Sequence, residues 1–118
     1  MNLFQITFAL FSLVAAGGLL MTAMVVAKIR IPAALGAGHG IAGLISLAVL
    51  LTVNLRSDAT PALAWWALAV LSAGFAGGVL LFRVLFRGAA PLLLLVVAHG
   101  SVAALGLYLL YGPAFRMS

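Results

Sequence analysis

The sequence predicts an all-α membrane protein with four transmembrane helices, and three observations lead to this fold class. Hydrophobic residues make up 67% of the 118 residues and charged residues only 6%, far below the roughly 25% of soluble domains. The apolar residues form four runs, each long enough at about 1.5 Å per residue to cross a hydrocarbon core of about 30 Å. The few charged residues lie at the ends of these runs. A soluble fold of this length cannot hide so much apolar surface, so the bilayer is the expected solvent.

The first predicted hairpin consists of helices over residues 3–27 and 32–53. The N-terminal run lacks the basic segment of a cleaved signal peptide, so we expect it to remain as a spanning helix. Pro32 suits the first turn of the second helix, where its missing N–H group is not needed. The second helix carries His39 inside a glycine-rich stretch.

The second predicted hairpin consists of helices over residues 61–86 and 90–111, after a polar loop at 54–61. Trp65 and Trp66 near its start and Tyr108 and Tyr111 near its end are typical of aromatic belts at a membrane interface. Pro91 falls in the first turn of the last helix, and Gly112-Pro113 is expected to end it.

Basic residues indicate the orientation in the membrane. The two short turns hold Lys28, Arg30, Arg83 and Arg87, whereas the opposite side holds Arg56 and Arg116, together with the only acid, Asp58. The positive-inside rule therefore predicts cytoplasmic short turns and non-cytoplasmic termini in a bacterial-type inner membrane. Six basic residues spread over helix ends do not form a nucleic-acid surface, so no nucleic-acid partner is expected.

The two hairpins, residues 3–54 and 61–112, resemble copies of one unit within a single domain, 1–118. Ala16–Leu20 corresponds to Ala76–Leu80, and His39-Gly40 corresponds to His99-Gly100, both at an offset of 60 positions. Because each unit has two spans, the repeat is parallel, with a pseudo-twofold axis along the membrane normal. Chance is the competing explanation, since small residues are common in membrane helices.

The repeat predicts that both histidines lie at the same depth, in the cytoplasmic half of the bilayer. Helical spacing places Gly43 and Ser46 on the face of His39, and Ala103 and Gly106 on the face of His99. We expect the second and fourth helices to be diagonal, so that the imidazoles face each other across a cleft. Two glycine pairs would thin the other two helices: Gly17 and Gly18, and Gly77 and Gly78.

This arrangement suits a flat ligand such as haem b, which takes an imidazole on each face of one iron and needs little bulk against its ring. The predicted cofactor and metal ligands are His39 and His99. Further cofactor contacts are expected from Gly43, Gly106, Arg83 and Arg87, where the arginines, with Lys28 and Arg30, would pair with propionates. At these two histidines the sequence resembles cytochrome b561-type membrane cytochromes. That resemblance implies a helical bundle that carries electrons, with quinone as a partner. The usual second histidine pair is missing, which implies one haem.

Other interpretations fit the same residues. The chain could be a structural or accessory subunit of a larger membrane complex, or form a homodimer. The histidines would then hydrogen-bond within helix interfaces, and the GxxxG spacing of Gly36 and Gly40 drives helix association without a cofactor. A chlorophyll-type pigment needs one histidine per ring. A metal ion alone fits poorly, because two imidazoles without a carboxylate or thiolate are an incomplete ligand set. A proton-coupled exporter needs an acidic residue within the membrane, and the only acid of this chain, Asp58, lies in a predicted loop.

Overall fold

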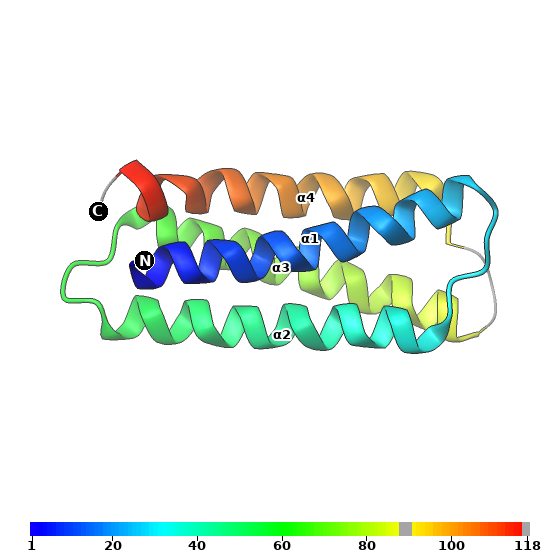
Figure 1. The fold of residues 1–118 in the computed structure, drawn as a ribbon, viewed down its shortest axis with the longest axis horizontal. Coiled ribbons are helices and arrows are strands. Elements are labelled where there is room, and N and C mark those ends of the chain that lie inside the picture. The colour runs from blue at the N-terminus through cyan, green and yellow to red at the C-terminus, as the bar shows by residue number, and fades with distance from the viewer. Residues whose placement is uncertain (88–90, 117–118) are drawn as a thin grey trace.

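The computed structural model describes residues 1–87 and 91–116, which form four long helices and one short π-helical segment. The elements are α1 (Leu3–Val26), α2 (Ala33–Arg56), α3 (Ala62–Phe86), α4 (Leu93–Tyr111) and η1 (Gly112–Arg116). Figure 1 shows the helices side by side, with the start of α1, η1 and the α2–α3 connection at one end and the α1–α2 connection, the end of α3 and the start of α4 at the opposite end. All four helices are long and apolar enough to cross a membrane. The chain is therefore an all-α, multi-pass membrane protein.

The ends of α1 show how local sequence sets the helix boundaries. At its start, Asn2 Oδ1 accepts a hydrogen bond from the Gln5 backbone at 2.8 Å, and Gln5 Oε1 accepts one from the Asn2 backbone at 3.1 Å. This reciprocal capping box satisfies donors that the first helical turn leaves free. At its end, Lys28 takes a left-handed conformation with φ 58°. The Ile29 N–H then bonds the Met24 carbonyl at 2.8 Å, as in a Schellman motif.

The helix boundaries differ from those predicted at both ends of α2 and at the start of α4, and by one residue at the end of α1 and at the start of α3. The second helix continues to Arg56 rather than ending at residue 53, because the side chain of Asn54 bonds the Ala64 carbonyl while its backbone stays helical. Pro32 occupies the N-cap position with extended ψ, so α2 begins one residue later than predicted. The fourth helix begins at Leu93, because Leu92 is an extended N-cap; the predicted start at Ala90 lies outside the described residues.

The chain also continues in helical form beyond the predicted stop at Gly112-Pro113. The α-helix ends at Tyr111 as expected, but Gly112–Arg116 follows as a π-helix in which Pro113 and Ala114 are buried. Phe115 packs edge-on against Phe8, with ring centroids 5.3 Å apart. This aromatic contact and the bond from Asn2 Nδ2 to the Ala114 carbonyl at 3.3 Å tie the C-terminal segment to α1.

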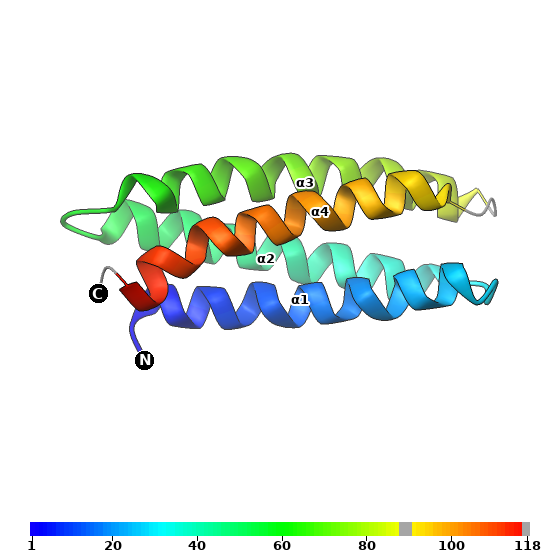
Figure 2. The ribbon, with the colours of Figure 1, turned by 90° about the horizontal axis from the view of Figure 1, so that it is seen from above.

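The bundle has a square arrangement in which α2 and α4 are diagonal, as predicted. Figure 2, with Figure 1, shows α1 beside α2 and α3 beside α4, and α2–α3 and α1–α4 are also in contact. Within the described part of the chain, no Cα atoms of α2 and α4 come within 8 Å of each other. Whether the two hairpins are tandem copies is not decided by this arrangement and stays a prediction.

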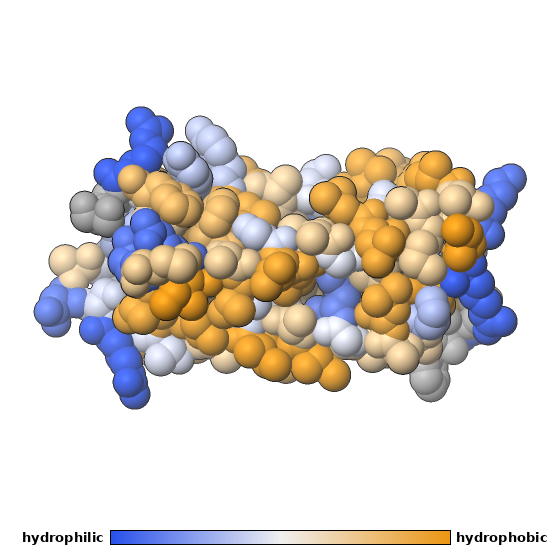
Figure 3. Space-filling model, viewed as in Figure 1, coloured by the Kyte–Doolittle hydropathy of each residue, from blue (hydrophilic) through white to orange (hydrophobic). Residues whose placement is uncertain are grey.

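Tight packing is concentrated in the half of the bundle that holds the termini. Its buried cluster consists of Phe11, Leu50, Ala67, Leu71 and Leu110. Most other large apolar side chains are exposed on the outside; Figure 3 shows them as a hydrophobic band between hydrophilic ends. This surface suits contact with lipid. The cavity described below lies between the short turns and this cluster, which it reaches at Phe11 and Leu71.

Candidate functional site

A cavity of about 570 Å³ lies among the four helices, and both histidines line it. Its volume is in the range of about 300–1,000 Å³ that is usual for ligand sites. The same two imidazoles also line a second void of about 90 Å³, which reaches Val25, Ile31 and Pro91 near the short turns. Together the voids run from Ile31 to Leu47 beside α2 and from Pro91 to Leu107 beside α4. Each histidine is the midpoint of its stretch, with about 12 Å of cavity wall on either side.

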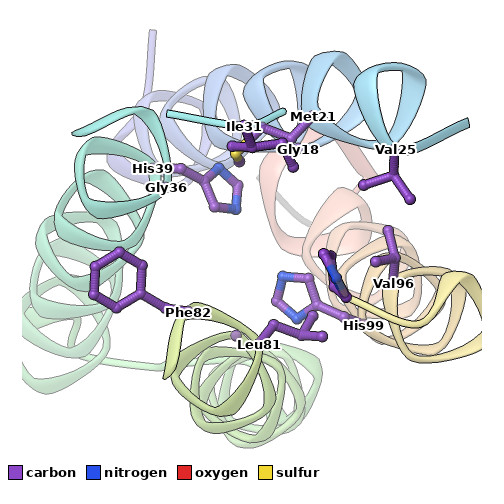
Figure 4. Close-up of a pocket in the computed structure, with 12 residues that line it drawn as sticks. Gly18, Met21, Val25, Ile31, Gly36, His39, Leu81, Phe82, Val96 and His99 are labelled. Carbon is purple, nitrogen blue, oxygen red and sulfur yellow. The ribbon is translucent and has the colours of Figure 1, made fainter. Parts of the chain in front are cut away.

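The imidazoles of His39 and His99 face each other across this space. Their ring centroids are 6.3 Å apart and the ring planes make an angle of 77°. Figure 4 shows each ring turning one nitrogen toward the other ring, with His39 coming from α2 and His99 from α4. Because these helices are diagonal, the pair spans the full width of the bundle interior.

Each imidazole rests on the glycine pair of the other helix in its hairpin. A Cβ atom built on Gly17 would lie 3.5 Å from His39 Nδ1, and one on Gly18 would lie 3.3 Å from His39 Cε1. For His99 the corresponding distances are 4.0 Å from Gly77 to Nδ1 and 2.9 Å from Gly78 to Cε1. The two rings are therefore held by the same kind of contact, with glycine and histidine 22 positions apart in both hairpins.

The ring nitrogens differ in their surroundings. Nδ1 of each histidine is buried and has no hydrogen-bond partner of acceptable geometry, although the backbone of Val14 interacts with the His39 ring. Figure 4 shows one nitrogen of each ring turned toward the other ring, and because Nδ1 is buried we assign that nitrogen as Nε2. The neighbouring hydroxyl of Ser46 is already used, because it donates to the Ala42 carbonyl at 2.8 Å.

The other predicted cofactor contacts have different positions. Gly43 lines the cavity, where an added Cβ would be 3.9 Å from both Phe75 and Val14. Gly106 does not line it; a Cβ there would overlap the side chain of Leu71, at 2.5 Å from its Cγ. Its spacing from His99 places it on the same face, but about 10 Å further along α4, in the tightly packed half.

Arg83 and Arg87 also lie outside the cavity lining, with exposed side chains at the end of the bundle that holds the short turns. Lys28 and Arg30 are exposed at the same end. No ion pair involves any of the four in the residues that the structure describes. Figure 3 shows hydrophilic side chains at both ends of the molecule.

Two parts of the site were not predicted from the sequence. The four glycines were expected to thin α1 and α3 against a ligand, whereas Gly18 and Gly78 lie so close to the histidine rings that an added Cβ would be only 3.3 Å and 2.9 Å from them. The equal spacing of glycine and histidine in both hairpins indicated only that the two pairs would be placed alike. The aromatic walls formed by Phe75 and Phe82 were also missed, because isolated phenylalanines in apolar helices carry no distinguishing pattern.

No protein family, curated protein or solved structure matches the chain. The site must therefore be interpreted from its own geometry. Within residues 1–87 and 91–116 no group of three or more His, Cys, Asp or Glu side chains could hold a metal ion. Two imidazoles on opposite sides of a cavity can bind a metal ion whose remaining ligands come from a bound planar molecule.

Proposed function

We propose that this chain is an integral membrane electron carrier of the b-type cytochrome class, with one haem b held between His39 and His99. One observation carries the proposal: the ring centroids lie 6.3 Å apart across a shared cavity. Imidazole–metal bonds of about 2.0–2.1 Å, with each nitrogen about 1.1 Å from its ring centre, put the centres of two rings on opposite sides of one metal about 6.2–6.4 Å apart. When bound, haem b supplies a one-electron ferric/ferrous couple.

The chain's own residues account for the binding. Nε2 of His39 and of His99 would be the ligating atoms, since Nδ1 of each ring faces away into buried surroundings. Ligation through Nε2 leaves the proton on Nδ1, and the Val14 backbone beside His39 is the kind of group that orients such a ring. Gly43 keeps the cavity wall thin. The walls of the cavity are mostly apolar.

The basic residues at the short-turn end of the bundle favour an orientation in which the polar edge of the ligand faces that end. The smaller void extends from the histidines to Ile31 and Pro91 beside the short turns, where four exposed cations lie: Lys28, Arg30, Arg83 and Arg87. Arg83 is five residues beyond Gly78, about 7.5 Å along α3. Haem propionates directed toward this end would approach the cations without crossing hydrocarbon.

The same charge distribution supports the orientation and partners that we propose. Four cations at the short-turn end, against Arg56 and Arg116 at the other, favour cytoplasmic turns and non-cytoplasmic termini in a bacterial-type inner membrane. A carrier with its cofactor at this depth would exchange electrons with a membrane partner such as quinone or with a larger membrane complex. A homodimer is a further arrangement that the exposed apolar surface permits.

The second candidate function is a structural or accessory subunit without a cofactor. The close seating of each imidazole on glycine favours it, because the same contact would serve helix packing alone. A packing histidine, however, is expected to satisfy its buried nitrogen with a hydrogen bond, since an unpaired imidazole is costly in lipid. At His99 Nδ1 the described residues supply no such partner, whereas the Val14 backbone interacts with the His39 ring.

An absorption spectrum of the purified protein, oxidised and then reduced with dithionite, tests the proposal. Wild type expressed with adequate haem should show a Soret band and resolved reduced α and β bands, and His39→Ala and His99→Ala should each lose them. Ser46→Ala is the matched control, because Ser46 lies on the same helix but outside the cavity lining. Colourless wild-type protein would reject the cytochrome proposal and favour the structural subunit.

A further inference from the structure

Gly78 lies closer to its histidine than a side chain would allow. A Cβ atom there would be 2.9 Å from His99 Cε1 and 3.5 Å from Nε2, distances at which the imidazole or the helix must move. On α1, the Cβ of a substituted Gly18 would be 3.3 Å from His39 Cε1, so this ring would have to give by less. In each case the histidine ring that would have to move carries the Nε2 atom that we assign to the cavity.

We propose that Gly78 and Gly18 are positioning residues that fix the rotation of the His99 and His39 rings and thereby aim the two Nε2 atoms at one point. The inference rests on the proposed function for its purpose, but the contact itself belongs to the ligand-free protein. An imidazole in a helix chooses among a few side-chain rotamers. The bare backbone at Gly78 and Gly18 lies beside the Cε1 edge of each ring and leaves room for a rotamer that a larger residue would exclude. Displacement by even about 0.5 Å is enough to spoil a ligand site.

The neighbouring glycines provide a matched comparison. Gly77 precedes Gly78 in the same helix, yet a Cβ there would make an ordinary 4.0 Å contact with His99 Nδ1. Gly38 precedes His39, lies outside the cavity lining, and has nothing within 4 Å of its added Cβ. An alanine at any of these positions has the same intrinsic helix preference. Differences among the variants therefore report the contact with the ring rather than helix formation.

The test compares Gly78→Ala and Gly18→Ala with Gly77→Ala and Gly38→Ala, after circular dichroism shows equal helix content. The first readout is NMR of ¹⁵N-labelled histidine in the ligand-free protein. Gly78→Ala should shift the ring signals of His99, Gly18→Ala those of His39 by less, and the two controls neither. Unchanged histidine signals in Gly78→Ala would overturn the inference, whether or not the protein binds haem.

The second readout is a haem titration of the same four variants. Loss of a group that orients a metal ligand typically costs about 10–100-fold in affinity, so Gly78→Ala should weaken haem binding at least about tenfold and Gly77→Ala should not. In a His99→Gly background, where added imidazole can find its own place, Gly78→Ala should have no further effect. Equal haem affinity of Gly78→Ala and Gly77→Ala would reject the positioning role. Absence of haem binding in wild type would instead reject the proposed function, while the NMR comparison still decides the inference.

Discussion

Gly106 is the glycine whose substitution should damage the fold most. Its added Cβ would lie 2.5 Å from Leu71 Cγ, and Leu71 is 7% exposed and part of the buried cluster. Overpacking of a tight core costs about 1–3 kcal/mol, and the gain in helix preference from Gly to Ala offsets at most about 1 kcal/mol. Because the added Cβ would overlap more than one atom of Leu71, the cost should fall in the upper part of this range, about 2–3 kcal/mol, and Gly106→Ala should lower the free energy of unfolding by about 1–2 kcal/mol.

Equilibrium unfolding in mixed detergent micelles, followed by circular dichroism, measures this effect. Gly100→Ala on the same helix is the control, since nothing lies within 4 Å of its added Cβ, and it should not destabilise. Leu71→Ala alone should cost about 2–5 kcal/mol, but together with Gly106→Ala the total should be at least about 1 kcal/mol below the sum, because the clashing atoms are gone. A Gly106→Ala protein as stable as wild type, or strict additivity in the double variant, would refute the packing argument.

Three further predictions concern the ends of the bundle. Asn2→Ala should reduce the free energy of unfolding by about 1 kcal/mol in the same assay, since it removes the capping box and the bond to Ala114. Asn2→Gly should reduce it by only a few tenths of a kcal/mol. Equal losses in the two variants would contradict the role of Asn2 as a helix cap. Lys28→Gly should stabilise by about 1 kcal/mol because φ is 58°, and Lys28→Ala, which keeps the strain, should not. Since the chain has no cysteine, single introduced cysteines can report its orientation in the membrane. In intact cells an impermeant thiol reagent should label Ala59→Cys but not Ile29→Cys. The reverse pattern would contradict the proposed topology.

The helices and their neighbours could be predicted because lipid imposes simple rules. Apolar length sets the spans, and the prolines and basic turns mark their ends. The diagonal placement of α2 and α4 followed from the expectation of two hairpins and agrees with the structure. The boundaries near Asn54 and Gly112 could not be predicted, because they depend on a bond to Ala64 and on the packing of Phe115 against Phe8. Such contacts join residues whose proximity the local sequence does not reveal.

The site was predictable only in its centre. His39 and His99 stand out because an imidazole in a membrane helix needs a reason to be there, and the structure brings them face to face. Gly106 shows the limit of helical-wheel reasoning: it shares a face with His99, but at its depth along the bundle that face packs against the Leu71 side chain and does not line the cavity. The contact of Gly18 and Gly78 with the rings required the relative height of neighbouring helices, which composition and spacing within one helix do not fix.

The central claim is that both imidazoles bind the same iron, and electron paramagnetic resonance of the oxidised protein tests it most directly. With ring planes at 77°, two imidazoles on one ferric haem should give a low-spin signal with a single dominant large g value, as nearly perpendicular axial rings do. It should integrate to one spin per chain and disappear in both His39→Ala and His99→Ala. A high-spin signal in wild type, or a low-spin signal that survives either substitution, would contradict ligation by this histidine pair.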